Sequence, residues 1–331
     1  MNIKLAEKIE LDSIQMRDVY AGCIVGMIEH GEPVMVLDAD LMRPLGILPY
    51  KDKYPENIID CGIAEANMIG VACGLSAEGF VPFTHSFAAF ASRRVMDQVF
   101  MSGAYARQNV KMVGSDPGVC AALNGGTHMA FEDVAMMRAV PEMTIIEPTD
   151  AVMLEDLLPK IAHSRGMVYL RLCRTETERI YAPGSDFEIG RAAVLREGND
   201  LTIIASGREV PEAVRAAGLL SARGISARVL DMFTVKPLDA GAVERAAVET
   251  GAIVTAENHN IIGGLGSAVA ELTSELCPVP VERVGVRDRF GVVGKTEYLM
   301  RRFALTAEDI VNSAMRVLER KRTEDSGRDK E

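Results

Sequence analysis

Tryptophan is absent from the 331 residues, aromatic residues make up 5%, and positive charge is scarce enough to leave a net charge of −11. No basic stripe with interleaved aromatics is present, so nucleic acid and anionic membrane surfaces are poor partners for this chain. No apolar run approaches the roughly 20 residues that span a bilayer. The acidic start also differs from a secretory signal peptide. We therefore expect no nucleic-acid partner and no membrane partner.

Several catalytic patterns are missing as well. The six cysteines form no C-x-x-C pair and have no ligand-like spacing to the five histidines. No serine lies in a G-x-S-x-G elbow, no two histidines share a helical turn, and no first βα turn carries the dinucleotide glycine fingerprint. These absences argue against a serine hydrolase, a zinc enzyme and a dinucleotide-binding enzyme. We expect no metal ligands in this chain, and scattered reduced thiols predict a cytoplasmic protein.

Apolar strands alternate with helices along the chain, which predicts parallel sheets covered by helices on both faces. Expected strands are 34–37, 58–59, 80–84, 110–113, 144–146, 168–172, 201–205, 227–230, 253–256 and 281–286, with helices including 16–30, 87–104, 131–140 and 265–276. The polar segment 175–190 contains Pro183-Gly184 and is typical of a linker. The sequence thus predicts two successive three-layer α/β domains, 1–180 and 181–318, and a charged tail, 319–331, that frays.

Two polar side chains lie where a strand or a loop leads into a helix. Glu65 falls in the first turn of a helix whose small residues, Gly70 and Gly74 among them, leave it almost bare. A carboxylate there could perform chemistry, or it could complement the helix dipole. His128 ends a glycine-rich loop, where an imidazole can act as an acid, a base or a hydrogen-bond donor, or simply occupy a turn. Both alternatives stay open for each residue.

Other candidates surround these two in the predicted fold. His85 ends a strand and is a candidate lining residue. Phe87 and Phe90 are one helical turn apart, with Arg93 three residues further on; such an aromatic pair is more often core than a stacking platform. Arg174 follows the last strand of the first domain, where it can hold a phosphate or carboxylate or pair with an acid.

Motifs in a fixed order carry a resemblance to a known family. They are Leu37-Asp38-Ala39-Asp40-Leu41, Asp60 to Glu65, Thr84 to Phe90, Gly125-Gly126-Thr127-His128, Asp231 to Asp239 and Glu257 to Gly266. On these runs the chain resembles the carboxyl-terminal half of transketolase over nearly its whole length. It is most similar to the smaller subunit of split transketolases. The resemblance implies a pyrimidine-binding (Pyr) domain followed by a transketolase C-terminal domain.

The resemblance also implies thiamine diphosphate as cofactor. The family acid that matches Glu65 hydrogen-bonds N1′ of the aminopyrimidine, and the aromatics that match Phe87 and Phe90 pack on that ring. The acid that matches Asp40 approaches the cofactor across a subunit interface. Arg93 stands where many members place a third aromatic residue. We expect these residues to form the cofactor-binding set, with Glu65 catalytic.

For the substrate, the resemblance makes His128 the residue that contacts the reacting carbonyl or hydroxyl and Arg174 the residue that holds the sugar phosphate. The sequence departs from the family pattern close to these positions. Asn124 replaces an acid that receives a substrate hydroxyl, and Asp116 replaces a histidine that assists phosphate recognition. Because Asp116 would repel a dianionic phosphate, we expect an atypical substrate, with Asn124, Asp116 and His85 also in its site.

Two further departures are Leu123 in place of a glutamate and Pro44 in place of a hydroxyl residue. The chain also lacks the GDG…N motif that holds the diphosphate through Mg²⁺. In split transketolases a separate amino-terminal-half chain supplies that domain. The resemblance therefore implies a partner subunit that mainly holds the Mg²⁺, and homodimerisation of this chain within an α₂β₂ assembly.

Two other classes of function remain open on the sequence. The chain could be half of another thiamine diphosphate enzyme, such as the β-subunit of a 2-oxoacid dehydrogenase or a deoxyxylulose-phosphate-synthase-like enzyme, although Thr127-His128 follows the transketolase pattern. It could also be a non-catalytic interaction subunit. Glu65 and His128 favour catalysis, whereas Leu123 and Asn124 keep the interaction subunit open. The leading interpretation is a subunit that transfers a two-carbon ketol unit between a ketose and an aldose.

Overall fold

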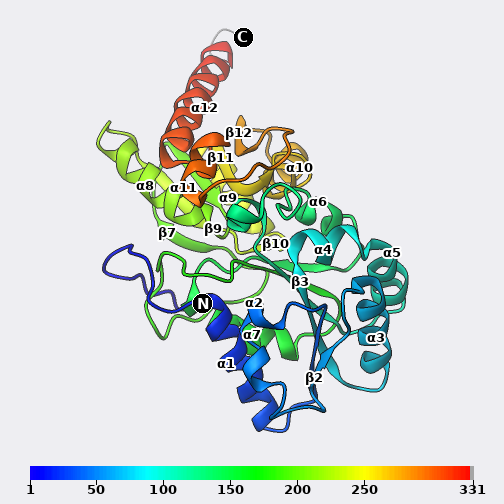
Figure 1. Cartoon of the computed structure of the whole chain (residues 1–331). Helices are drawn as coiled ribbons and strands as arrows, with labels where there is room; N and C mark the ends of the chain where they lie inside the picture. Colours follow the sequence, from blue (N-terminus) through cyan, green and yellow to red (C-terminus); the bar gives the residue numbers. More distant parts are fainter. Residues whose placement is uncertain (329–331) are drawn as a thin grey trace.

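The computed structural model describes residues 1–328, with side chains described through residue 323. Two mainly parallel sheets lie one above the other, each between layers of helices (Figure 1). The amino-terminal half of the chain builds most of the lower layers, and residues from about 190 onward build the upper ones. The predicted fold class, two successive α/β domains with mainly parallel sheets, is confirmed.

The first sheet is built almost entirely by the amino-terminal half. Its strands are β1 (Val34–Asp38), β2 (Ile58–Asp60), β3 (Val81–Phe87), β4 (Lys111–Ser115), β5 (Thr144–Ile146), β6 (Val168–Leu172) and β10 (Thr234–Lys236). They lie in the order β10-β5-β6-β4-β3-β1-β2, and only β10 runs antiparallel to its neighbour. The carboxyl ends of the parallel strands therefore meet at one edge.

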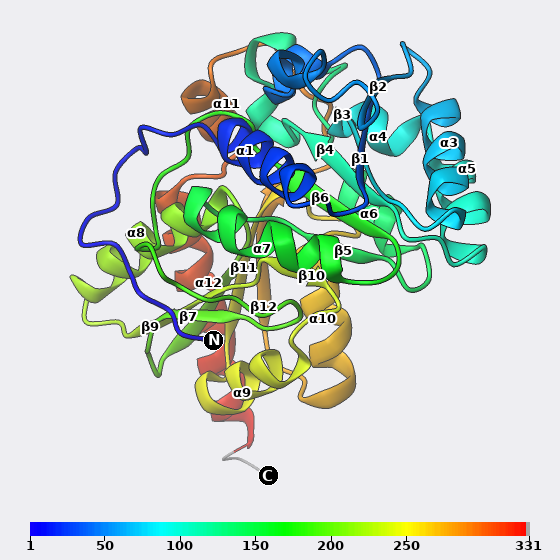
Figure 2. The same cartoon turned by 90° about the horizontal axis from the view of Figure 1, so that it is seen from below.

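Helices cover both faces of this sheet. They are α1 (Met16–Glu29), α2 (Met42–Leu45), η1 (Leu48–Tyr50), α3 (Glu65–Ala77), α4 (Ala88–Arg93), α5 (Met96–Gln98), η2 (Val99–Tyr105), η3 (Gly118–Asn124), α6 (Asp133–Arg138) and α7 (Ala151–His163). Val34 and Val36 pack into the core that contains α1 and α7, which lie side by side in Figure 2. Met35 and Leu37 pack into the core that contains α3. This alternation explains why β1 is apolar at every core position.

The second sheet lies in the order β12-β11-β8-β9-β7. Its strands are β7 (Ala193–Arg196), β8 (Leu201–Ala205), β9 (Ala227–Asp231), β11 (Ile253–Asn260) and β12 (Val281–Val286), with β7 antiparallel to β9. Its helices are α8 (Glu209–Ser221), α9 (Ala240–Thr250), α10 (Leu265–Leu276), α11 (Thr296–Arg302) and α12 (Ala307–Arg328). Helices α8 and α12 pack together, as do α9 and α10.

The two halves of the chain are joined by backbone pairing as well as by the linker between them. Strand β10 leaves the second half and pairs with β5 of the first sheet. The predicted linker is also paired, because Leu5 bridges to Tyr181 and Leu11 bridges to Glu178. The expected domain boundary between residues 180 and 181 lies inside this paired segment and stays a prediction.

Two predicted elements differ in the structure. The helix expected over 87–104 begins at Ala88, because Phe87 still has extended backbone and pairs with Ser115 in the sheet. It is divided into α4, α5 and the π-helical turn η2, and Val95, with φ of −125°, leaves helical geometry between α4 and α5. The tail expected to fray from Glu319 is helical through Arg328. Arg320 binds Glu282, and Lys321 donates to the carbonyl oxygens of Asp200 and Thr250. These contacts hold the start of the tail on the second domain; residues 329–331 lie outside the described part.

None of the helices within residues 1–328 is long and apolar enough to cross a membrane.

Candidate active site

The candidate site lies at the carboxyl edge of the first sheet, where open α/β sheets place ligands. Asp40 follows β1, Phe87 ends β3, Asp116 follows β4 and Arg174 follows β6. These strands are neighbours in the order β6-β4-β3-β1, so the sheet itself brings their ends together. Residues far apart in the sequence thereby share one edge of the fold.

Glu65 is the first residue of α3 and is 5% exposed. Its Oε1 accepts a hydrogen bond from Nη1 of Arg94 at 2.5 Å, and its second oxygen makes no hydrogen bond within the described chain. A Cβ added at Gly70 or Gly74 would meet no atom within 4 Å. This chain therefore leaves the small-residue face of α3 uncovered, and Glu65 keeps one oxygen available at its start.

Arg94 is a site residue that the sequence motifs did not single out. Besides binding Glu65, its guanidinium lies 4.0 Å from the ring centroid of Phe90. The available signal was the spacing of Phe90 and Arg94, which puts four-apart residues on one helical face. The family resemblance pointed to Arg93 instead, because Arg93 matches a family aromatic.

The aromatic side chains and the loop histidine form one cluster. The ring centroid of His128 lies 5.7 Å from that of Phe87 and 5.2 Å from that of Phe90, both in edge-on arrangements. Phe87 and Phe90 are 6.2 Å apart. His128 Nδ1 lies 3.0 Å from the hydroxyl of Thr127, so this neighbour can fix the tautomer of the imidazole. The structure thus brings three predicted site residues into mutual contact.

Arg93 supports the loop that carries His128. Its Nη2 donates to the carbonyl oxygens of Thr127 and Met129, each at 3.4 Å, and its Nε lies 2.7 Å from Glu132. The side chain therefore ties the backbone on both sides of His128 to α4. The sequence led us to expect that Arg93 binds the cofactor, and that role stays a prediction.

Asp116 and Arg174 form an ion pair next to the aromatic cluster. Asp116 is buried, has a positive φ of 52°, and accepts from Nε and the backbone N–H of Arg174. The guanidinium carbon of Arg174 lies 5.5 Å from the ring centroid of Phe87. Burial raises the pKa of Asp116, while the charge of Arg174 opposes that rise. Asp116 is thus the partner of Arg174 and not the isolated negative charge that the sequence suggested.

His85 does not line the site surface, contrary to the expectation. The imidazole is fully buried within β3, with Nδ1 2.6 Å from Oδ2 of Asp38 and Nε2 3.0 Å from the hydroxyl of Ser115. Both ring nitrogens are therefore used inside the sheet. The expectation was wrong because a residue near a strand end was assumed to face the opening, whereas β3 continues to Phe87.

The loop from η3 to His128 brings Leu123 and Asn124 to the surface. A Cβ at Gly126 would come within 2.3 Å of the carbonyl oxygen of Gly291, and one at Gly125 would come within 2.8 Å of Val293. The loop thus packs closely against the second domain, which requires glycine at both positions. Asn124 makes no hydrogen bond with the cluster within the described residues.

Asp40 is also exposed, on a backbone with φ of 61°, and its N–H donates to Asp60 Oδ1 at 3.1 Å. Among the described residues, its side chain forms no hydrogen bond or ion pair with the cluster, so its expected role across a subunit interface remains a prediction. No group of three or more His, Cys, Asp or Glu side chains that could hold a metal occurs in the part of the chain that the structure describes.

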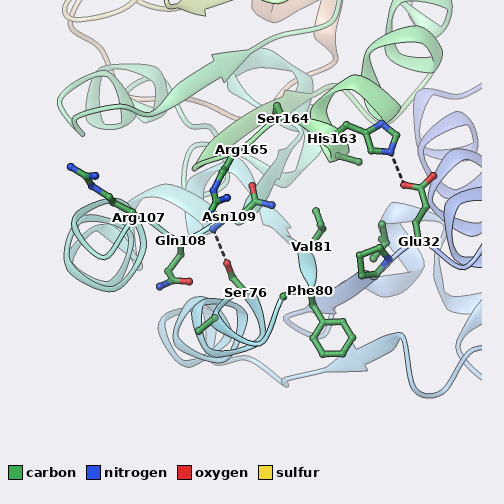
Figure 3. Close-up of a pocket in the computed structure, with 15 residues that line it drawn as sticks. Glu32, Ser76, Phe80, Val81, Arg107, Gln108, Asn109, His163, Ser164 and Arg165 are labelled. Carbon is green, nitrogen blue, oxygen red and sulfur yellow. Dashed lines mark hydrogen bonds and ion pairs between the residues drawn. The ribbon is translucent and has the colours of Figure 1, made fainter.

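A cavity of about 730 Å³ lies at the opposite, amino-terminal edge of the first sheet (Figure 3). Val34 and Val81, the first residues of β1 and β3, line it together with the ion pair of Glu32 and His163, 3.1 Å apart. The cavity shares no lining residue with the candidate site. Its volume therefore says nothing about the chemistry at the carboxyl edge.

Comparison with protein-family models decides which family has this arrangement. Residues 12–179 match the pyrimidine-binding domain of transketolase, and residues 190–310 match the transketolase C-terminal domain. The chain belongs to the transketolase family. The resemblance inferred from the sequence motifs is therefore confirmed.

Similar proteins include transketolase subunits that are encoded as separate chains. The chain is 52% identical over 314 residues to the 6-deoxy-6-sulfo-D-fructose transketolase subunit of Clostridium sp. strain MSTE9, covering 95% of this chain and 98% of that one. It is 34% identical to an apulose-4-phosphate transketolase subunit of Phocaeicola vulgatus, covering 91% and 97%. A split-gene transketolase solved as an inactive β4 tetramer superposes with a TM-score of 0.84 at 40% identity, covering 93% and 99%. The chain is a transketolase-type subunit, as the sequence predicted.

Proposed function

We propose that this chain is the catalytic half of a two-chain transketolase, which transfers a two-carbon ketol unit between a ketose donor and an aldose acceptor. The observation that carries the proposal is the position of Glu65. Its carboxylate starts an uncovered helix, keeps one oxygen without a hydrogen-bond partner in the described chain, and connects through Arg94 to the cluster of Phe90 and His128. The arrangement has the features of half of a site that a second subunit completes.

The residues at this edge fit the aminopyrimidine of thiamine diphosphate. A carboxyl oxygen of Glu65 is available for a ring nitrogen, and Phe87 and Phe90 supply aromatic surface nearby, with Arg94 against the ring of Phe90. When bound, the cofactor supplies the electron sink that carbon–carbon bond cleavage requires. Glu65 would hold a proton at the ring nitrogen, and the two phenylalanines would fix the plane of the ring.

The remaining residues act on the sugar in this proposal. His128, held in place by Thr127 and by Arg93, is positioned to exchange a hydrogen bond or a proton with the reacting oxygen of the ketose. Arg174 presents its guanidinium beside Phe87 to an anionic end of the substrate. Asn124 can both donate to and accept from a sugar hydroxyl.

In this proposal a partner subunit supplies the diphosphate-binding domain. The partner, an amino-terminal-half transketolase subunit, would hold the diphosphate and most of the Mg²⁺ coordination, and two copies of each chain would form α₂β₂. Asp40, exposed at the end of β1, would approach the cofactor across that interface. We place the enzyme in the cytoplasm, where its six cysteines, all free in the structure, would stay reduced.

The test is Glu65→Gln in the assembled enzyme. Removing the carboxylate while keeping the size of the side chain should lower kcat by about 10²-fold or more, the scale typical of a lost proton-transfer partner, with little change in the melting temperature. Glu78→Gln is the matched control, because Glu78 is an exposed residue that follows the other end of α3. Full turnover by Glu65→Gln would remove Glu65 from the mechanism.

A further inference from the structure

We infer that Asp116 sets the charge of the subsite that receives the far end of the ketose, so that the subsite suits a singly charged terminal group such as a sulfonate. The inference rests on the proposed function and deepens it. Nothing in the family resemblance assigns this task to an aspartate, because the matching position is a histidine. The geometry of the pair that Asp116 makes with Arg174 carries the inference.

The pair is built into the fold. Asp116 Oδ2 accepts from Nε of Arg174, and Oδ1 lies 3.4 Å from the backbone N–H of the same residue. The carboxylate side chain is 3% exposed, whereas the arginine side chain is 23% exposed. Since Nε is used by Asp116, the two terminal nitrogens of Arg174 form the part of the guanidinium that can reach solvent or a ligand.

The pair also lies where a sugar would end. The guanidinium carbon of Arg174 lies 5.5 Å from the ring centroid of Phe87, and the same ring lies 5.7 Å from that of His128. One aromatic ring therefore separates the arginine from the residue proposed to contact the reacting oxygen. A ketose bound with its reacting carbon at His128 would extend its other end along Phe87 toward Arg174.

Charge then decides which terminal group is favoured. An unpaired arginine carries a charge of +1. It attracts a phosphate, which carries about −1.5 to −2 near neutral pH, more strongly than a sulfonate, which carries −1. The adjacent carboxylate of Asp116 cancels most of that charge. The second negative charge of a phosphate therefore adds little to the binding energy. Both groups present three oxygens to the terminal nitrogens, so hydrogen bonding is retained for either.

One relative agrees with this inference. The relative at 52% identity is named for a sugar with a sulfonate at carbon 6. A sulfonate stays singly charged over the whole range in which enzymes work, so a subsite of low net charge suits it. The pair of Asp116 and Arg174 provides such a subsite without removing the arginine that binds oxygen atoms.

The experiment compares two ketoses in the assembled enzyme, 6-deoxy-6-sulfo-D-fructose and D-fructose 6-phosphate. Asp116→Asn restores the full charge of Arg174, and we expect it to raise the ratio of kcat/KM for the phosphate over that for the sulfonate by about tenfold. The change should lie mainly in KM, because the charge acts on binding of the terminal group. Asp186→Asn is the matched control, since it removes the same charge from an exposed ion pair with Lys160 and should leave the ratio unchanged.

A ratio that stays within about twofold of wild type would overturn the inference, whether both activities persist or fall together. Binding of the two ketoses, measured by calorimetry on the same complexes, gives the ratio independently of turnover. If the wild-type complex binds both sugars and transfers no ketol unit, the proposed function fails while the binding ratio still decides the role of Asp116.

Discussion

Glu65 and Glu209 are both buried glutamates at the first position of a helix, yet their surroundings differ. Glu65 has Arg94 beside it and lies at the candidate site. Neither carboxyl oxygen of Glu209 has a hydrogen-bond partner in the described structure, and burial raises the pKa of Glu209 well above its usual range. Position in a helix therefore does not determine what a carboxylate does; its neighbours do.

Glu209→Gln should stabilise the protein at neutral pH. In the unfolded chain a glutamate ionises above pH about 4.3, whereas the buried side chain resists ionisation, so wild-type stability falls as the pH rises above that value. Glutamine cannot ionise and escapes this loss. We expect a gain of about 1 kcal/mol in the free energy of unfolding at pH 8, shrinking toward zero near pH 4.3, measured by urea unfolding. Glu244→Gln, at an exposed position of α9, is the control. A gain in stability that does not depend on pH would show that ionisation of Glu209 is not its cause.

Several candidate site residues could be named from the sequence because they belong to short motifs. Phe87, Phe90 and His128 are in mutual contact, and Arg94 links Glu65 to Phe90; the roles expected of them stay predictions. His85 was misplaced, because burial depends on the length of β3. Arg94 was missed, because its contacts with Glu65 and Phe90 join two elements. Motifs identify residue types in order, but contacts between elements depend on the assembled fold.

At the scale of elements, parallel strand order explains why the site lies at one edge. The apolar runs predicted the parallel strands, because buried parallel strands are apolar on both faces. They did not predict β7 and β10, the two antiparallel strands at the sheet edges. Helix boundaries were less predictable where the sheet competes with a helix. The sequence pattern favours a helix at Phe87, yet its pairing with Ser115 in β4 keeps it extended and delays the start of α4.

Asp150 joins two elements and offers a test of how the linker is held. Its side chain caps α7 by accepting from Met153 N–H at 2.9 Å, and it accepts from the N–H groups of Ile180 and Tyr181 at 2.8 Å each. Asp150→Ala would remove the cap and leave two buried donors without an acceptor. We expect a loss of about 2–4 kcal/mol in the free energy of unfolding.

Urea unfolding measures that loss, and amide hydrogen exchange locates it. Exchange at Ile180 and Tyr181 should quicken more than exchange within β8 of the second sheet. A variant with wild-type stability and unchanged exchange at these two amides would show that the linker is held by other contacts.

At the scale of the whole molecule, Arg171 shows how the two domains are held together. This buried side chain of β6 binds Asp133 and Glu147, and its Nη2 donates to the carbonyl oxygen of Asn258 in β11 at 2.8 Å. These contacts join residues up to 87 positions apart in sequence, so no local sequence pattern predicts them. The same holds for the contact of Gly126 with Gly291, which places the loop of His128 against the second domain.

The uncovered face of α3 and the Glu65 oxygen that has no hydrogen-bond partner in the described chain fit a site that another subunit completes in the proposed assembly. In the proposed assembly this chain should be inactive alone. Ketol transfer in the proposed enzyme therefore requires both this chain and its partner.

The most direct test is reconstitution with the amino-terminal-half subunit of a split transketolase, thiamine diphosphate and Mg²⁺, followed by an assay of ketol transfer from a panel of ketoses that differ at the terminal group. We predict transfer only when both chains are present, and loss of transfer with Glu65→Gln. Ketol transfer by this chain alone, or no transfer from any ketose by the assembled complex, would contradict the proposed two-chain transketolase.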